Sequence, residues 1–372
     1  MLKAILIDCI PPSVTPKEAD YRLSEAESLV KTYGGVVLVK KIQKKLIPNY
    51  ATYIGGGKIE EIVELNTTLG ANIVIINNEL KPRQIYNLSE KLKKNGLEVW
   101  DRVDLILKIF QKHATTREAK LEIQLASIKH MGPRIFGMGM ELSRQGGGIG
   151  TKGVGETNTE FMKRHLARME HRILEQLEEC KKVRKVHRDA RKRKNLPTVG
   201  IIGYTNVGKT SLLNALTRKG AYAAHKLFAT LDTRVGKIYF PENAKEALVS
   251  DTIGFIQDLP TTLIKSFQST LEETIEADLL LHVMDVSDPR MTEKIKIVNV
   301  ILAQIDALYK PTLYVLNKID CLPKKERTAL LKKMAGEFKR HESFWVSSVS
   351  GEGLMELKKG MQKSLGLLGM LY

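Results

Sequence analysis

The feature that most constrains this chain is a glycine-rich loop between an apolar run, 198–202, and a helix that starts at Lys209. The loop matches G-x-x-x-x-G-K-[ST]. Its glycines let backbone N–H groups close around a phosphate, and the helix N-terminus adds partial positive charge. We expect Lys209 to reach the β- and γ-phosphates and Thr210 to bind Mg²⁺. The predicted phosphate-binding residues are Gly203, Tyr204, Thr205, Asn206, Val207, Gly208, Lys209 and Thr210.

Three later segments indicate which nucleotide binds, and each follows an apolar run that we expect to be a strand. The carboxylate of Asp251 is expected to face Mg²⁺, and the N–H of Gly254 the γ-phosphate. The N-K-x-D sequence ending at Asp320 suits guanine, because a carboxylate accepts hydrogen bonds from N1–H and the exocyclic amine, whereas adenine has an acceptor at N1. The segments are Asp251, Thr252, Ile253 and Gly254; Asn317, Lys318, Ile319 and Asp320; and Ser347, Ser348 and Val349, expected to support the base.

Each segment alone is also compatible with an ordinary strand end or turn. All of them, however, follow strands in the order expected of a doubly wound sheet, in which ligands bind at the carboxyl ends of the strands. Together they predict a guanine-nucleotide site in a C-terminal P-loop GTPase domain with a mostly parallel sheet.

Length and charge bound what surrounds this site. A chain of 372 residues predicts two or three domains. Its net charge of +17 favours a polyanionic partner, nucleic acid ahead of membrane. No apolar run approaches the ~20 residues of a membrane-spanning helix, and the first apolar run is too short for a signal peptide. Three widely spaced cysteines indicate neither disulfides nor zinc, so we expect a reduced, cytoplasmic protein.

The first hundred residues alternate short apolar strands with amphipathic helices, which is typical of a separate parallel α/β domain. The expected strands are 4–7, 36–39, 73–76 and 98–100, and the expected helices 21–33, 58–65, 83–94 and 102–110. Three glycines precede Lys58 at the start of one helix. They lack the P-loop spacing, so both a tight turn and a second anion site stay open.

Two long helices follow, 115–131 and a second from about Glu160, whose apolar residues recur every three or four positions. That spacing predicts an antiparallel hairpin. The glycine-rich run 144–156 between them is either a flexible tip or a loop that moulds to a partner, with Arg144 and Lys152 for phosphates. The second helix ends in the basic segment, 181–194, in which nine of fourteen residues are Lys or Arg. This segment predicts either an RNA-phosphate contact or a charged arm against the nucleotide domain.

Asn195-Leu196-Pro197 ends the helix and sets a domain boundary. We therefore expect a parallel α/β domain at 1–112, a helical hairpin at 113–195 and the GTPase domain at 196–372.

With these residues in view, the chain resembles the HflX family of ribosome-associated GTPases over nearly its whole length. The resemblance is carried by Tyr53–Lys58, Trp100-Asp101-Arg102, the glycine run 147–157 and the P-loop. It implies a first switch segment made of Phe228, Ala229, Thr230, Leu231 and Asp232. Thr230 would join Thr210 and Asp251 at Mg²⁺, and would act in catalysis with Lys209 and Gly254. The resemblance also implies that the glycine loop enters the catalytic centre region of the large ribosomal subunit, and that some members split ribosomes.

Hydrolysis without a partner is expected to be slow. Phe255 stands where a glutamine orients the attacking water in many GTPases, and its side chain offers no hydrogen bond. Asn206 occupies a position at which related GTPases hold K⁺, so K⁺ is a candidate second cofactor.

The function expected from the sequence is that of a monomeric GTP hydrolase that binds the large ribosomal subunit and its rRNA and promotes ribosome splitting or rescue. One alternative is an ATP-driven RNA-remodelling enzyme working from the N-terminal domain, with the GTPase as regulator. Another is a peripheral membrane regulator that binds a protease.

Overall fold

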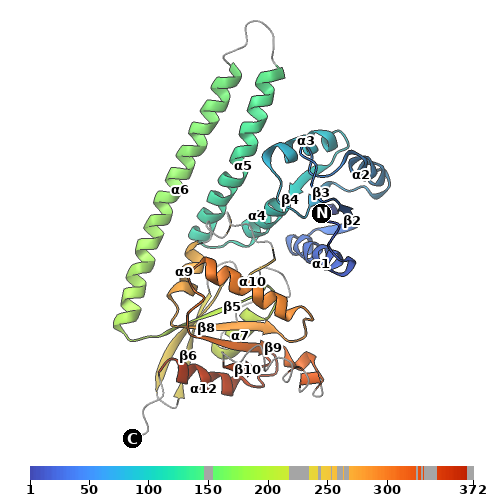
Figure 1. Cartoon of the computed structure of the whole chain (residues 1–372). Coiled ribbons are helices and arrows are strands. Elements are labelled where there is room, and N and C mark those ends of the chain that lie inside the picture. Colours follow the sequence, from blue (N-terminus) through green and yellow to red (C-terminus); the bar gives the residue numbers. More distant parts are fainter. Residues whose placement is uncertain are drawn as a thin grey trace. The chain divides into compact units, whose positions relative to one another are not determined.

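The computed structural model describes residues 1–145, 154–217, 234–241, 244–252, 254–257, 263, 268–323, 326–327, 330 and 342–366. These residues form two compact units, Met1–Glu178 and Glu179–Tyr372 (Figure 1). Helix α6 (Val154–Arg193) runs across this division without a break and contributes residues to both units.

The first unit contains a four-stranded parallel sheet in the order β2-β1-β3-β4. Its strands are β1 (Lys3–Ile10), β2 (Val36–Lys44), β3 (Ile73–Ile76) and β4 (Glu98–Asp101). Parallel strands are covered on both faces, and β1 and β3 are accordingly almost continuous apolar runs. The predicted parallel α/β architecture is confirmed.

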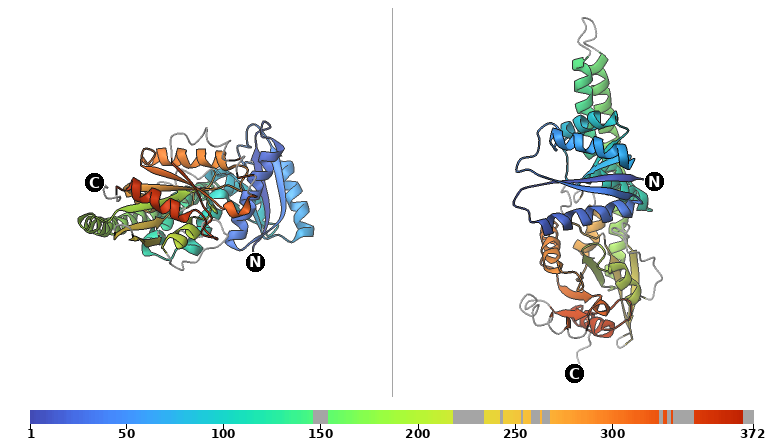
Figure 2. Two further views of the ribbon diagram at one scale, coloured as in Figure 1. Left: turned by 90° about the horizontal axis from the view of Figure 1, so that it is seen from below. Right: turned by 90° about the vertical axis from the view of Figure 1, so that its right-hand side faces the viewer.

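Helices cover both faces of this sheet. They are α1 (Pro16–Tyr33), α2 (Gly56–Leu69), α3 (Pro82–Lys93) and α4 (Arg102–His113). Ile59 of α2 and Leu88 of α3 pack with Ile5 and Val74 in one core cluster, while α1 lies on the opposite face, as Figure 2 shows. Helix α1 begins where the Thr15 side chain accepts a hydrogen bond from Glu18 N, and it ends at a glycine in the left-handed region.

Helix α5 (Arg117–Gln145) and α6 form the predicted helical hairpin, and both are longer than the sequence indicated. Arg144 and Gln145 belong to α5, and Val154 to α6. The expectation that the whole run 144–156 lies outside regular structure is therefore wrong at both ends, because each added residue gains a backbone hydrogen bond once a helix is nucleated. Residues 146–153 lie outside the described part of the chain.

The two hairpin helices lie side by side in Figure 1, and Lys129 of α5 forms an ion pair of 3.9 Å with Glu170 of α6. The predicted apolar stripe of α6 is only partly covered. Ile173 is buried, but Met162 and Met169 are exposed. The described part of this apolar stripe is therefore not buried continuously, as it would be in a coiled coil.

The second unit contains a six-stranded sheet in the order β10-β9-β8-β5-β7-β6. All pairs are parallel except β6 with β7, so the predicted doubly wound, mostly parallel sheet is confirmed. The strands are β5 (Thr198–Gly203), β6 (Arg234–Phe240), β7 (Lys245–Asp251), β8 (Leu279–Asp285), β9 (Thr312–Asn317) and β10 (Ser343–Trp345).

Two pairs of helices enclose this second sheet. Helices α7 (Lys209–Thr217) and α12 (Leu354–Ser364) contribute Leu212 and Leu357 to one core cluster. Helices α9 (Gln268–Glu276) and α10 (Met291–Gln304) contribute Leu271 and Val298 to the cluster that also contains Leu280 of β8. The carboxyl ends of β5, β7 and β9 thereby meet at one edge of the sheet. Among the described helices, none combines the length and the apolar character that crossing a membrane requires.

Candidate nucleotide-binding site

At two positions in the loop after β5, only glycine fits the backbone conformation. Gly203 has φ 147° and Gly208 has φ 93°. A Cβ atom would lie 2.4 Å from the Val283 carbonyl oxygen at the first and 2.4 Å from Asn317 Nδ2 at the second. The loop therefore needs glycine both for its conformation and for its close approach to β8 and β9.

Lys209 folds back over this loop. Its Nζ donates hydrogen bonds to the carbonyl oxygens of Tyr204 at 2.9 Å and Gly203 at 3.3 Å. Burial lowers the pKa of Lys209 to about 8, and the charge of Asp251 opposes that shift. A phosphate in the loop would replace carbonyl dipoles by full negative charge, which favours the protonated lysine.

Thr210 and Asp251 are brought together at the end of β7. Thr210 Oγ1 donates a 2.7 Å hydrogen bond to Asp251 Oδ2, and the Asp251 side chain is fully buried. Gly254 is equally close to the loop, since a Cβ there would lie 2.8 Å from Lys209 Nζ. Thr252 holds this segment to β5 by donating to the Ile201 carbonyl oxygen at 2.7 Å.

Asn317 connects two of the predicted segments to each other. Its Nδ2 donates to the Val207 carbonyl oxygen at 2.9 Å, and its Oδ1 accepts from Ser348 N at 3.1 Å and Ser348 Oγ at 2.9 Å. With its side chain buried, Asn317 braces the P-loop against the loop after β10.

Lys318 makes a second connection of this kind. It has φ 66°, and its Nζ donates to the Asn206 carbonyl oxygen at 2.8 Å and to Asp285 Oδ2 at 2.6 Å. Asp285 was not among the residues predicted from sequence. One signal in the sequence could have identified it: Asp285 is an acidic residue at the end of β8. This strand lies between β5 and β9, and the residues that follow both of those strands were assigned to the site.

Asp320 is exposed, and a hydrogen bond from the Ser347 hydroxyl lowers the pKa of its carboxyl group. Ser347 Oγ also accepts from Ser350 N at 3.0 Å and Val349 N at 3.3 Å, which fixes the loop. Ile319 is buried beneath Asp320. The arrangement keeps an ionised carboxylate open to hydrogen-bond donors.

Phe255 turns away from this edge of the sheet. Its N–H donates to the Gly203 carbonyl oxygen at 3.2 Å, and its own carbonyl accepts from Thr205 N at 2.8 Å. The ring is buried in the cluster that contains Ile202 and Leu271. The position that follows Gly254 thus supplies core packing and no side chain to orient water. The predicted residues Ile253, Phe228, Ala229, Thr230, Leu231 and Asp232 lie outside the described part of the chain.

A mostly parallel sheet with a P-loop after β5, a buried aspartate at the end of the neighbouring strand β7 and an N-K-x-D segment braced against the P-loop defines the class of P-loop GTPases.

Comparison with known proteins identifies the family. Residues 20–111 match the family model described as GTP-binding GTPase N-terminal, 113–191 the GTP-binding GTPase Middle Region, and 198–318 the 50S ribosome-binding GTPase. GTPase HflX of Caldanaerobacter subterraneus subsp. tengcongensis is 45% identical over 320 residues, 86% of this chain and 73% of that protein. GTPase HflX of Escherichia coli (strain K12) is 39% identical over 347 residues, 92% of this chain and 79% of that protein.

A crystal structure described as SsGBP in complex with GDP is 27% identical, covers 99% of each chain and has a TM-score of 0.54. The chain belongs to the HflX GTPase family. It is a GTP hydrolase that binds GTP and GDP.

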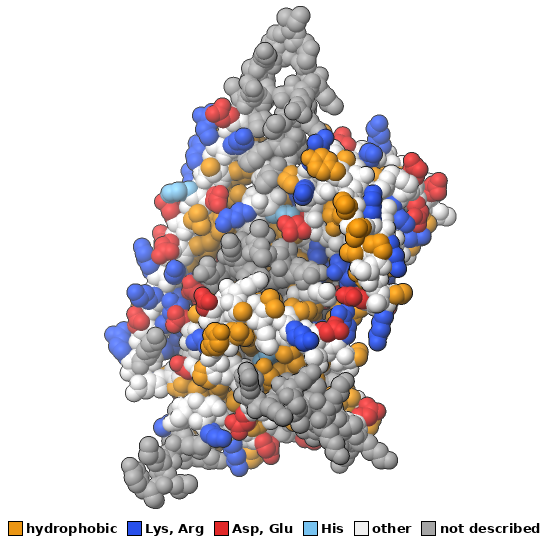
Figure 3. All heavy atoms as spheres, in the orientation of Figure 1, with side chains coloured by type: hydrophobic (Ala, Val, Ile, Leu, Met, Phe, Trp, Pro, Cys, Tyr) orange, Lys and Arg blue, Asp and Glu red, His pale blue; other side chains and the backbone are white. Residues whose placement is uncertain are grey.

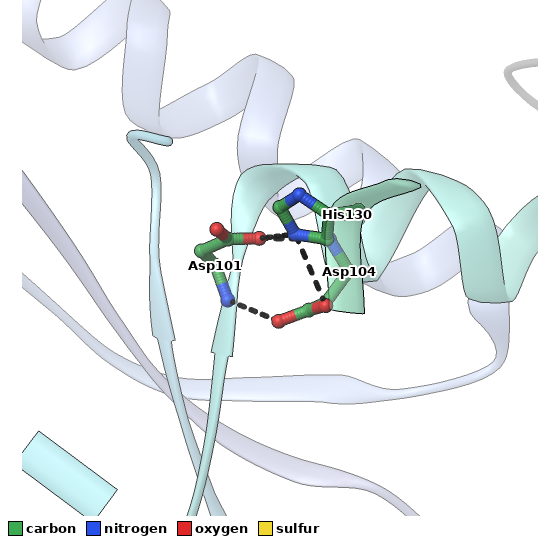
Figure 4. A group of neighbouring side chains, drawn as sticks. All are labelled: Asp101, Asp104 and His130. Atoms are coloured by element: carbon green, nitrogen blue, oxygen red, sulfur yellow. Dashed lines mark hydrogen bonds and ion pairs between the residues drawn. The ribbon is translucent and has the colours of Figure 1, made fainter. Parts of the chain in front are cut away.

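A separate cluster of charged side chains lies in the first unit. Within the described ranges, Asp101, Asp104 and His130 are the one group of three potential metal ligands (Figure 4). Arg134 donates to Asp104 Oδ2 and Asp101 Oδ2 at 2.7 Å each, so its guanidinium takes the place that a cation would occupy. Burial lowers the pKa of His130, but the hydrogen bonds that its ring donates to the carboxylates of Asp101 and Asp104 outweigh burial and raise the pKa to about 9. A protonated histidine is no metal ligand. The cluster fastens α5 to the start of α4.

The glycines before Lys58 form a tight entry into α2. Gly55 is the N-cap residue, and its N–H donates to Gln43 Oε1 at 2.9 Å. Lys58 forms an ion pair of 2.5 Å with Glu61. The sequence left open a tight turn and a second anion site, and these contacts support the tight turn.

Proposed function

We propose that this GTPase binds RNA of the large ribosomal subunit in its GTP state, promotes the splitting or rescue of ribosomes, and is reset by hydrolysis. The observation that carries the proposal is the exposed basic face of α6. Lys and Arg side chains gather along this helix in Figure 3. In the basic segment, the Lys and Arg side chains that the structure describes as exposed are Lys181, Lys182, Lys185, Arg193 and Lys194.

This face suits a polyanion without sequence discrimination. Closely spaced Lys and Arg side chains neutralise phosphates and release counterions, which supplies affinity that falls steeply with salt. The description of the family model over 198–318 names 50S ribosome binding, in agreement with this surface.

The nucleotide site supplies the switch. We propose that Thr210 and Asp251 hold Mg²⁺, because an uncharged hydroxyl oxygen and a buried carboxylate 2.7 Å apart are the hard oxygen donors that this ion prefers. When bound, Mg²⁺ neutralises charge on the β- and γ-phosphates. The protein's own contribution is to aim Lys209 and the Gly254 backbone at the γ-phosphate and Asp320 at guanine. A segment that is ordered by the γ-phosphate then changes the surface offered to RNA.

K⁺ binding at Asn206 is also part of this proposal. Asn206 is exposed and has φ 65°, so its side chain faces away from the core. A cation there would stand near developing phosphate charge. The measurement is the hydrolysis rate in K⁺ and in Na⁺ at equal ionic strength; equal rates would remove K⁺ from the mechanism.

Sedimentation of purified large subunits tests the binding step. The protein is centrifuged with them in GTP, GDP or a non-hydrolysable GTP analogue. We expect the protein in the pellet with GTP and the analogue, and mostly in the supernatant with GDP. Equal pelleting in all three nucleotides would show that GTP does not control the association.

A further inference from the structure

Three arginines of the basic segment are engaged inside the second unit. Arg184 Nη2 donates to Glu272 Oε2 at 2.9 Å, and Arg188 Nη1 donates to the same oxygen at 3.3 Å. Arg191 Nη2 lies 3.6 Å from Glu273 Oε1. The arginines are four and three residues apart, so they share one face of α6. Their side chains are only 14–21% exposed, and those of the two glutamates 16%.

The basic segment therefore has two faces, one in contact with α9 and one exposed. Arg184, Arg188 and Arg191 meet carboxylates of α9, whereas Lys181, Lys182 and Lys185 are exposed. The ion pairs support the interpretation of this segment as a charged arm against the nucleotide domain, and the RNA-phosphate contact stays a prediction for the exposed lysines.

Helix α9 is the described helix that follows the Asp251–Gly254 segment, and it is packed against the same core. Leu271 of α9 shares a cluster with Phe255, the residue next to Gly254, and with Ile202 of β5. Thr274 is fully buried near Gly200, where a Cβ would lie 3.8 Å from Thr274 Cα. One side of α9 thus rests on the strand that leads into the P-loop, and the other side of the same turn presents Glu272 and Glu273 to α6.

We propose that Glu272 and Glu273 form a coupling link through which the nucleotide state sets the position of α6. A shift of the Gly254–Phe255 backbone on γ-phosphate binding moves Leu271, and α9 carries the arginines of α6 with it. Since α6 continues to Val154 without a break, the displacement reaches the hairpin. The consequence of this link at the ribosome rests on the proposed function, but the link itself can be measured in the protein alone, without ribosomes.

Partly buried ion pairs suit such a link. Exposed pairs hold two flexible side chains weakly, whereas here one carboxylate is shared by two guanidinium groups and little of either is in water. Replacing the two carboxylates removes the negative charge that the three arginines of α6 meet on α9, so we expect this attachment to weaken while the residues of the nucleotide site are unchanged.

The test uses the full chain with Glu272→Gln and Glu273→Gln. Spin labels are placed at the exposed positions Val183 on α6 and Val300 on α10, in a background with Cys180→Ser and Cys321→Ser. We expect the distance distribution between the labels to differ between GDP and a GTP analogue in the parent chain. In the double variant we expect this difference to vanish, with GDP affinity unchanged within about twofold. Unchanged nucleotide dependence in the variant, or none in the parent, would overturn the link.

A charge-swap variant is the control for loss of the effect through general destabilisation of the fold. Glu272→Arg combined with Arg184→Glu and Arg188→Glu rebuilds the pairs with opposite polarity, and we expect it to restore the nucleotide-dependent distance change. Failure of this exchange in a chain that folds and binds GDP would count against the link.

Stimulation of GTP hydrolysis by large subunits separates the link from the proposed function. We expect the stimulation to fall at least tenfold in the Gln variant and to persist in Lys181→Gln, Lys182→Gln, Lys185→Gln at saturating subunits. If the parent chain is not stimulated at all, the proposed function fails while the distance measurement still decides the link. If the parent and the Gln variant are stimulated equally, the link fails alone.

Discussion

The protonation of Lys209 should depend on whether a nucleotide is bound. Without phosphate, its Nζ is surrounded by the loop's carbonyl groups, and burial lowers its pKa to about 8. A bound phosphate favours the charged form. At pH 8 roughly half of the lysines are neutral before binding, so nucleotide binding should take up about half a proton at this pH and much less at pH 7.

Isothermal titration calorimetry with GDP in buffers of different ionisation enthalpy measures this uptake. We predict a binding enthalpy that depends on the buffer at pH 8 and hardly at pH 7. Enthalpies independent of the buffer at pH 8 would mean that Lys209 is already charged in the free protein.

Asp320 should decide the base. Its carboxylate is ionised and supported by Ser347. Loss of two charge-assisted hydrogen bonds, each worth roughly 1.5–3 kcal/mol, lowers affinity at least about 100-fold. Asp320→Asn should therefore lose GTP and gain XTP, whose carbonyl accepts from the new amide. Ser347→Ala is the milder control, since it removes only the support. Competition binding with both nucleotides measures the exchange, and full GTP affinity in Asp320→Asn would contradict the assignment.

The sequence could predict the site residues because each belongs to a local pattern: glycines at fixed spacing, or polar residues directly after a strand. It could not predict that Lys318 binds Asp285 and the P-loop backbone, or that Asn317 braces Val207 and Ser348. Those contacts join residues more than thirty positions apart, and their geometry depends on how β8, β9 and β10 pack. The roles assigned to the site residues in binding nucleotide and Mg²⁺ remain predictions, and so do those of Thr230 and the other residues of 228–232, which lie outside the described part of the chain.

On α6, the exposed lysines should carry the salt dependence of RNA binding. Each phosphate contact contributes roughly one unit to the slope of log affinity against log salt. We predict that Lys181→Gln, Lys182→Gln, Lys185→Gln flattens the slope by up to about three units. The matched control removes the same charge at the C-terminal end of α3, with Lys91→Gln and Lys93→Gln in the helix and Lys94→Gln at its C-cap, all exposed. Binding of large subunits across a salt series is the measurement, and equal slopes for both variants would exclude α6 as the RNA contact.

At the base of the hairpin, His130 should make the stability of the first unit depend on pH. Its pKa in the folded chain, about 9, is above the usual value near 6.5, so its contribution is complete below pH 6.5 and is lost as pH rises through 9. The full difference amounts to about 3 kcal/mol at most, with Arg134 already occupying part of the same carboxylates.

Urea unfolding followed by Trp100 fluorescence, in a Trp345→Phe background, measures this dependence. We predict that the free energy of unfolding falls between pH 6.5 and 9, and that His130→Gln removes the fall. His171→Gln, at an exposed histidine of α6, should leave it unchanged. A parent chain with equal stability at both pH values would show that His130 is neutral in the cluster.

The alternation of apolar runs and helices was enough to predict the parallel α/β sheet of the first unit, because parallel neighbours require helical crossovers. The mostly parallel sheet of the second unit was predicted from motifs that each follow a strand. The lengths of α5 and α6 were not predictable in the same way. Glycine lowers helix propensity, so the run 144–156 gave no signal that α5 reaches Gln145 and that α6 begins at Val154. The division of 181–194 into an α9-binding face and an exposed face also needed the position of Glu272.

For the molecule as a whole, the contact with α9, the hairpin and the lysines that we propose as the RNA surface all lie on one helix. Helix α6 carries the exposed lysines, meets α9 through three arginines and extends into the hairpin. A GTPase that binds its target tightly only when the γ-phosphate is present can use the difference in affinity between its GTP and GDP states once per hydrolysis cycle. The release of phosphate returns it to the weakly bound state.

Dissociation of intact ribosomes, resolved on sucrose gradients, tests this account most directly. Ribosomes are mixed with the protein and GTP, a non-hydrolysable GTP analogue or GDP. We expect GTP and the analogue to convert whole ribosomes into separate subunits, with the protein on the large one, and GDP to leave them intact. Ribosomes that stay whole in GTP and in the analogue although the protein co-sediments, or that separate equally well in GDP, would contradict it.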